Sequence, residues 1–219
     1  MRTIALLSQK GGSGKSTIAV HLAVIAQASG LRTVLIDLDP QRSAAGWWDT
    51  RSAPTPELVE TTPDGLRAVL EAAQADGVAF CVVDTRPSAG ADTAAAAALA
   101  DLVLIPTRPS IFDLRAIGAT VEIVAKARAP AFIVLNTVPA PRGAGLASVT
   151  SDARRIIAAE YAIPLAPVAI GQRVAMAHAL IDGRAVNEFD PHGKAAREMT
   201  QLWHLVEAAL WPSDLRLAR

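Results

Sequence analysis

The chain has 219 residues, 51% of them hydrophobic, and a formal net charge of +0 at pH 7. This length can bury a sizeable core and this composition excludes a disordered protein, while the balanced charge gives no overall attraction to nucleic acid. A single cysteine, Cys81, with no signal peptide and no membrane-length apolar run, leads us to expect a globular protein of the reducing cytoplasm.

A glycine-rich segment, residues 9–17, follows a short apolar run and precedes an apolar-periodic stretch at residues 18–28. Strand, glycine-rich turn and helix are the layout of a phosphate-binding loop, in which backbone N–H groups and the positive end of the helix attract a polyphosphate. In this pattern Lys15 reaches the β- and γ-phosphates, and the Ser16 hydroxyl ligates Mg²⁺. The predicted nucleotide-binding loop consists of Lys10, Gly11, Gly12, Ser13, Gly14, Lys15, Ser16 and Thr17.

Two further predicted strands end in aspartate, residues 32–37 at Asp37 and residues 78–84 at Asp84. Ligands of parallel α/β sheets bind at the carboxyl ends of the strands. Four apolar residues before Asp84 form the Walker B pattern, whose carboxylate holds a Mg²⁺ water. Asp37 is expected to be structural or an outer partner of that water. Asp39, two residues further on, either acts in the site or caps a helix ahead of Pro40.

The rest of the chain alternates helices and strands. This alternation predicts one domain over residues 1–219, an α/β fold whose mostly parallel twisted sheet has helices on both faces. The expected helices are residues 41–49, 64–75, 91–100, 113–128, 146–161 and 191–210. The expected strands are an edge strand near Leu58 and residues 101–106, 131–136 and 163–168. Of Trp47 and Trp48, adjacent on a helix, one should be core.

The phosphate-binding loop departs from the usual pattern in having Gln9 at its first glycine position and a second lysine, Lys10, before the glycine pair. This deviant loop resembles that of the ParA/MinD family of P-loop ATPases. A second similarity lies in residues 171–186, where an arginine-led helix ends at a glycine before a valine. The resemblance covers nearly the whole chain. With no residues for an N-terminal helix-turn-helix, the chain is most similar to short, ParF-like plasmid partition ATPases.

The resemblance implies roles for several residues. Lys10 would reach across a dimer interface to the nucleotide of the partner chain, Lys15 would bind phosphate, and Asp39 would place the attacking water. These three are the candidate catalytic residues, and Ser16, Asp39 and Asp84 are the candidate Mg²⁺ site. Asn136, at the end of a predicted strand, would meet the adenine base, although capping or turn formation explains it equally well. Residues 107–113 would line the nucleotide and the dimer seam, although Asp113 could equally be the N-cap of the helix that runs to about residue 128.

Arg86 stands where the family usually has proline or glycine. It would contact the γ-phosphate, act across the dimer, or lie in solvent or in a structural ion pair, which is the simpler interpretation. Our hypothesis from the sequence is that Arg86 modulates hydrolysis.

The activity implied by the resemblance is Mg²⁺-dependent hydrolysis of ATP to ADP. The ATP-bound homodimer would bind DNA non-specifically, associate with the nucleoid and partition plasmid or chromosomal DNA with a centromere-binding, ParB/ParG-like adaptor. The candidate DNA contacts, each equally explained by a solvated helix face, are Arg154, Arg155, Arg173, Lys194 and Arg197.

Other classes of protein fit the sequence less well. A MinD-like membrane-surface ATPase needs a basic amphipathic tail, whereas residues 211–219 are few and broken by Pro212. An iron–sulphur carrier needs paired bridging cysteines, and Lys10 argues against a metabolic ligase on the same fold. An ATPase that positions a conjugation, chemotaxis or cellulose-synthesis apparatus stays open, because fold analogy does not identify the cargo.

Overall fold

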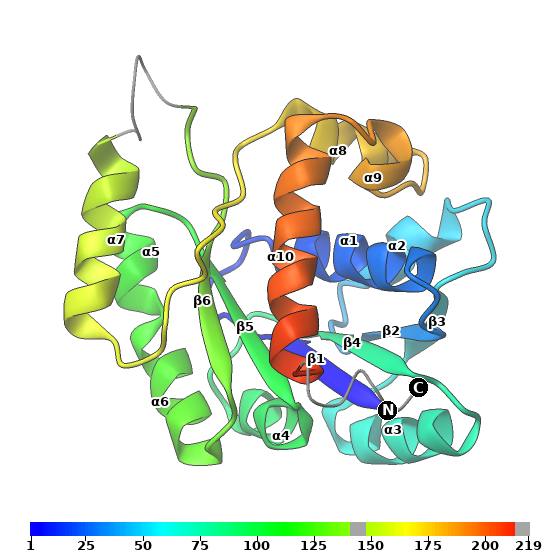
Figure 1. The fold of residues 1–219 in the computed structure, drawn as a ribbon. Helices are drawn as coiled ribbons and strands as arrows, with labels where there is room; N and C mark the ends of the chain where they lie inside the picture. Colours follow the sequence, from blue (N-terminus) through cyan, green and yellow to red (C-terminus); the bar gives the residue numbers. More distant parts are fainter. Residues whose placement is uncertain (141–147, 213–219) are drawn as a thin grey trace.

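The computed structural model of the protein describes residues 1–140 and 148–212. Six strands form one sheet in the order β3-β2-β4-β1-β5-β6, and every pairing between neighbours is parallel (Figure 1). The strands are β1 (Arg2–Leu6), β2 (Thr33–Asp37), β3 (Glu57–Glu60), β4 (Phe80–Asp84), β5 (Leu102–Thr107) and β6 (Ala131–Leu135). The predicted parallel sheet is confirmed, with β3 as the expected edge strand.

Helices cover both faces of the sheet, as predicted, because successive strand side chains point to opposite faces. Ile4 and Leu6 belong to one hydrophobic cluster, Ala5 and Leu7 to the other. The first cluster is covered by α1 (Lys15–Ala28), α2 (Ser43–Asp49), α8 (Val174–Ile181), α9 (Val186–Phe189) and α10 (Lys194–Leu210). The second is covered by α3 (Leu66–Ala75), preceded by the 3₁₀ turn η1 (Pro63–Gly65), α4 (Ala91–Leu99), α5 (Ile111–Ala116), α6 (Gly118–Ala127) and α7 (Ser148–Glu160).

The register of the central strands brings three loops to one edge of the sheet. Leu6 of β1 is the Cα partner of Asp84 in β4, and Asp84 is the partner of Asp37 in β2. The loops that follow β1, β2 and β4 therefore leave the sheet side by side, as is usual for ligand sites in parallel sheets.

The strand predicted at residues 163–168 is wrong. This segment runs beside β6, but it makes one isolated bridge, between Leu165 and Ile133. Pro164 and Pro167 fall within it, and two prolines in six residues, each without an N–H to donate, disfavour a continuous ladder.

The single helix predicted over residues 113–128 is also wrong. Two helices, α5 and α6, meet at Ile117. In a continuous helix the Leu114 carbonyl would accept from the backbone N–H of Gly118, but here it accepts from the Tyr161 hydroxyl at 2.6 Å. The N-cap of α5 is Ser110 rather than Asp113, because the Ser110 side chain accepts from the Asp113 backbone N–H.

The other helices agree with the prediction to within a few residues at their ends, which is the usual uncertainty of such boundaries. Trp47 is the core member of the tryptophan pair, and the half-buried Trp48 donates to the Pro56 carbonyl at 2.9 Å. The beginning of the helix expected at residue 146 and the tail at residues 213–219 lie outside the described residues. None of the helices described is both long and apolar enough to cross a bilayer.

Candidate functional site

The phosphate-binding loop joins β1 to α1, and its backbone requires glycine at two positions. Gly12 and Gly14 have φ angles of 71° and 96°, in the left-handed region that favours glycine. A Cβ atom at Gly12 would lie 2.7 Å from Arg108 Nη2, and one at Gly14 would lie 1.9 Å from Asn136 Nδ2. The positive φ angles and the close neighbouring side chains together explain why both positions require glycine.

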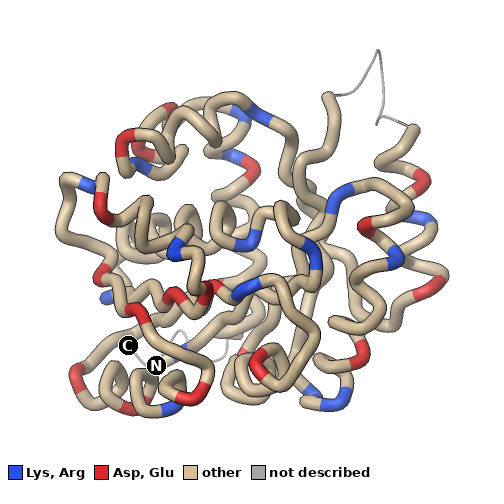
Figure 2. The backbone as a smooth tube through the Cα atoms, turned by 180° about the vertical axis from the view of Figure 1, so that it is seen from behind, with Lys and Arg blue, Asp and Glu red and all other residues tan. Residues whose placement is uncertain are grey.

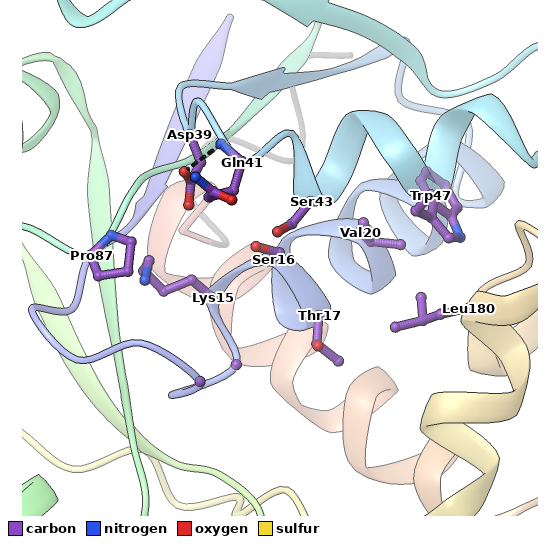
Figure 3. A pocket seen from close by; sticks show the side chains of 12 residues that line it. Lys15, Ser16, Thr17, Val20, Asp39, Gln41, Ser43, Trp47, Pro87 and Leu180 are labelled. Atoms are coloured by element: carbon purple, nitrogen blue, oxygen red, sulfur yellow. Dashed lines mark hydrogen bonds between the residues drawn. The ribbon is translucent and has the colours of Figure 1, made fainter.

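Two cavities flank this loop. The first, about 380 Å³, is lined by Lys15, Ser16 and Asp39 among others, with Trp47 and Leu180 on its far wall (Figure 3). The second, about 340 Å³, lies on the side of β6 and the segment that follows it. Both are lined by Gly12, Gly14, Thr17 and Leu180. The loop therefore lies between two adjoining cavities. The first is lined by Asp39, and the second by Asn136 and Met176.

Lys15 and Asp84 are both buried beneath the loop, where the charge of each affects the pKa of the other. The residues are 5% and 0% exposed. Burial lowers the pKa of Lys15, whereas Asp84 and Asp39 raise it. Burial raises the pKa of Asp84 to about 7, and the nearby Ser16 hydroxyl and Lys15 ammonium oppose the shift.

The donors around Asp84 suit a magnesium ion. Neither carboxylate oxygen of Asp84 has a hydrogen-bond partner among the described residues, although both are buried. Over residues 1–140 and 148–212 no three His, Cys, Asp or Glu side chains gather to hold a metal by themselves. Mg²⁺ commonly binds through one or two protein oxygens, waters and substrate phosphates, so Asp84 and Ser16 fit such a site.

Asp37 is structural, as one of the two sequence-based alternatives had it. Its Oδ1 accepts from the Asp39 backbone N–H at 2.9 Å, and its Oδ2 accepts from Ala44 and Ala45 at 3.1 and 3.0 Å. The carboxylate therefore caps the first turn of α2. Burial raises the pKa of Asp37, and these backbone hydrogen bonds oppose that shift.

Asp39 lines the first cavity from its position after β2. Its Oδ1 accepts from the Gln41 backbone N–H at 2.9 Å, a local turn that fixes the side chain (Figure 3). Asp37, rather than Asp39, accepts from the first turn of α2. The alternative that Asp39 caps this helix is therefore wrong, and its bond to Gln41 is a local turn. The half-buried Asp39 side chain is held beside Lys15 and Ser16.

Lys10 is not among the residues that line the cavity around Lys15. Its Nζ lies 3.1 Å from Asp113 Oδ2, and the two side chains are 41% and 7% exposed. The structure thus brings Lys10 together with Asp113 of α5, a contact that the sequence did not reveal.

Asn136 is 4% exposed, and its Nδ2 donates to the Ser13 carbonyl at 2.8 Å. The residue also lines the second cavity, so its expected meeting with a base remains a prediction. Sequence reasoning assigned no individual role to Arg108, whose Nη2 donates to the Gly12 carbonyl. The available signal was an arginine directly after β5, at the edge where the other loops end.

Arg86 pairs with Asp92 of α4 and is not among the residues that line either cavity beside the loop. With its side chain 49% exposed, it fits the simpler interpretation of a structural ion pair.

The late basic residues do not form one free patch. Arg154 donates to the Pro167 carbonyl, Arg155 pairs with Asp152, and Arg173 pairs with Glu198. Figure 2 shows basic positions interspersed with acidic ones over the back of the molecule. Lys194 and Arg197, at the start of α10, are exposed, and Arg197 donates to the His192 carbonyl at 2.7 Å.

A parallel sheet whose first strand leads through this loop into a helix, above a buried lysine and aspartate, defines the class of P-loop nucleotide-binding proteins. The chain belongs to the CobQ/CobB/MinD/ParA nucleotide binding domain family, which matches residues 4–186.

Named relatives share most of the chain. The maintenance of carboxysome distribution protein A of Gloeobacter kilaueensis is 36% identical over 203 residues, covering 90% of this chain and 88% of that protein. Protein IncC of Escherichia coli is 29% identical over 228 residues, covering 84% of this chain and 62% of that protein. The structure of the septum site-determining protein MinD of Pyrococcus horikoshii with Mg-ADP shares the fold, with a TM-score of 0.71 and 17% identity over 94% of this chain and 96% of that one.

Proposed function

We propose that the protein is a Mg²⁺-dependent ATPase that dimerises on ATP and positions a cargo. The observation that carries the proposal is the cavity beside the phosphate loop, which Lys15, Ser16 and Asp39 line, with Asp84 buried close to Lys15. Phosphoryl transfer to water needs charge stabilisation and a positioned nucleophile rather than covalent catalysis, and these residues supply both.

Each residue has one task in this proposal. The loop N–H groups and Lys15 bind the β- and γ-phosphates, and the Ser16 hydroxyl and a water held by Asp84 bind Mg²⁺. The metal, when bound, neutralises phosphate charge. Asp39, held by its turn at the cavity wall, orients the water that attacks the γ-phosphate. Lys10 of a second copy offsets the charge that develops there.

Exposed apolar side chains near the site support a second copy as the partner. Phe112, next to the Lys10–Asp113 pair, is 73% exposed, and Ile181, next to the cavity-lining Leu180, is 74% exposed. Val174 at the other end of α8 is 71% exposed. Apolar side chains mark a protein contact surface where they form a contiguous patch, so we propose these three as contacts of the second copy.

The cargo is proposed from the relatives. The name of the carboxysome distribution protein favours an ATPase that positions a cargo. We extend the sequence-based prediction of an adaptor protein, non-specific DNA binding and nucleoid association to the ATP-bound dimer. Lys194 and Arg197 are the best remaining candidates for phosphate contacts. A DNA cargo, with a centromere-binding adaptor, and a protein cargo both remain within this proposal.

The test of the ATPase is phosphate release measured with Mg²⁺ and ATP. Lys15→Ala should abolish nucleotide binding. Asp39→Ala should bind ATP but release phosphate at no more than about one hundredth of the wild-type rate. Lys126→Ala, at an exposed position on α6, is the matched lysine control. Wild-type protein that neither binds nor hydrolyses ATP would contradict the proposal.

The test of DNA binding is retention of a random-sequence duplex with ATP or ADP over a series of salt concentrations. Retention should require ATP and fall steeply with salt. The double variant Lys194→Ala/Arg197→Ala should reduce the slope of log binding constant against log salt concentration by about two. If the double variant binds DNA with the wild-type slope, these residues make no phosphate contacts.

A further inference from the structure

Two neighbouring carbonyl groups of the phosphate loop are each held by a side chain from another strand end. The Gly12 carbonyl accepts from Arg108, which follows β5, and the Ser13 carbonyl accepts from Asn136, which follows β6. Neither contact is local, since 96 and 123 residues separate the partners.

These contacts decide which way the loop N–H groups point. The peptide unit is planar and trans, so its C=O and N–H bonds point in opposite directions. Holding the Gly12 carbonyl toward Arg108 therefore aims the Ser13 N–H the other way, and holding the Ser13 carbonyl aims the Gly14 N–H. A carbonyl that turned toward the phosphate would repel it, while N–H groups attract it.

The two holding residues differ in how firmly they are seated. Asn136 is 4% exposed, and its backbone N–H donates to the Thr107 carbonyl at 2.8 Å, where β5 and β6 end in register. Arg108 is exposed and lines the second cavity. Asn136 is thus a fixed support, and Arg108 is an exposed support.

We propose that Arg108 and Asn136 are positioning residues that preset the loop for a polyphosphate by holding the Gly12 and Ser13 carbonyls away from it. The inference rests on the proposed function and deepens it, since it concerns recognition of the phosphates rather than the base. It predicts that losing the Arg108 side chain weakens binding of pyrophosphate and ADP alike and leaves binding of adenosine unchanged. Losing the Asn136 side chain should weaken binding of pyrophosphate, a ligand that has no base.

The experiment is calorimetric titration of the full chain with pyrophosphate, ADP and adenosine, with Mg²⁺ present. Arg108→Met keeps the length of the side chain but removes its donors, and Arg108→Lys keeps one donor. Arg115→Met, at an exposed position on α5, is the matched control. We expect Arg108→Met to weaken pyrophosphate and ADP about tenfold, and Arg108→Lys to remain within about threefold of wild type.

Asn136→Asp tests the second support, because a carboxylate of the same shape cannot donate to the Ser13 carbonyl. We expect a loss for pyrophosphate and ADP at least as large as for Arg108→Met. If Asn136→Asp fails to fold, the two variants Arg108→Met and Arg108→Lys still test the positioning role. Arg108 is exposed, so the thermal midpoint of both variants without ligand should match that of wild type.

The outcomes separate this inference from the proposed function. Wild-type protein that binds neither pyrophosphate nor ADP would overturn both. Wild-type binding together with unchanged affinity in Arg108→Met would overturn the positioning role alone. Equal losses for adenosine and pyrophosphate, or no rescue by Arg108→Lys, would also overturn it, because the effect would then not run through the donated hydrogen bond.

Discussion

The Nζ of Lys10 lies 3.1 Å from Oδ2 of Asp113, so the lysine that is expected to serve a partner chain is bound within its own. Asp113 is nearly buried, and the Ser110 hydroxyl donates to its carboxylate, whereas the lysine side chain is 41% exposed. A pair with one exposed member contributes little to stability and can open at low cost. The contact therefore competes with any use of Lys10 in another molecule.

The first prediction follows from that competition. Asp113→Asn removes the charge that holds Lys10 but leaves an oxygen for the Ser110 hydroxyl, so it should strengthen the ATP-dependent dimer by about three- to tenfold. The dissociation constant is measured by sedimentation in ATP, in an Asp39→Ala background that slows hydrolysis. Asp152→Asn, which breaks an exposed pair with Arg155, is the control. A weaker dimer in Asp113→Asn would mean that Asp113 presents the lysine instead.

The second prediction concerns pH and Asp84. Its pKa is about 7 in the folded protein, whereas the ordinary pKa of an aspartate is 3.8, so the folded state binds this proton more tightly. The corresponding stability is present below pH 3.8 and is lost as the pH rises to about 7. Asp84→Asn mimics the protonated form at every pH, so its advantage over wild type should grow across this range and reach roughly 4 kcal/mol at pH 8, at 1.36 kcal/mol per unit of pKa.

This second prediction is checked by urea unfolding at pH 5 and pH 8 without Mg²⁺ or nucleotide. Burial lowers the pKa of His21 to about 4, so stability from His21 is lost as the pH falls below about 6.5. That contribution cancels when the variant is compared with wild type at each pH. An Asp84→Asn protein less stable than wild type at pH 8 would show that Lys15 stabilises the ionised carboxylate more than burial penalises it.

The third prediction concerns the cap of α2. Asp37→Ala leaves the Asp39, Ala44 and Ala45 N–H groups without their acceptor, and the first turn of α2 should loosen. We expect the free energy of unfolding to fall by about 2–4 kcal/mol. Asp49→Ala, at the exposed end of the same helix, should cost less than about 0.5 kcal/mol. Equal losses for the two variants would argue against the capping role.

The fourth prediction concerns Arg86. Because its guanidinium pairs with Asp92, Arg86→Ala should change phosphate release less than about twofold. Turnover is compared with Arg67→Ala, at an exposed position on α3. A change beyond about fivefold would instead support the sequence-based hypothesis that this residue modulates hydrolysis.

Local and periodic features of the chain were predictable. The glycine-rich loop, the strands that end at Asp37 and Asp84, and the parallel direction of the strands follow from motifs, spacing and the alternation of strands and helices. The strand at 163–168 was over-predicted because apolar content outweighed its two prolines. The break between α5 and α6 depends on Tyr161, which is 47 residues away from Leu114.

The side-chain contacts between loops were beyond prediction for the same reason. Asp113 and Asn136 contact the phosphate loop because β5 and β6, which precede them, lie on the same side of β1 in the sheet. No periodicity in the sequence encodes which side chains of two strand ends meet. The variants at Asp113 and Asn136 test these contacts directly.

The most direct test of the central claim is the mass of the protein in solution, measured by light scattering with Mg²⁺ and either ADP or ATP. The Asp39→Ala protein should have a mass near 22.8 kDa in ADP and about twice that in ATP. Adding Lys10→Ala should abolish the ATP-dependent doubling, and adding Lys126→Ala should not. A mass that is the same in ADP and ATP, or a doubling that persists without Lys10, would contradict a dimer completed by this lysine.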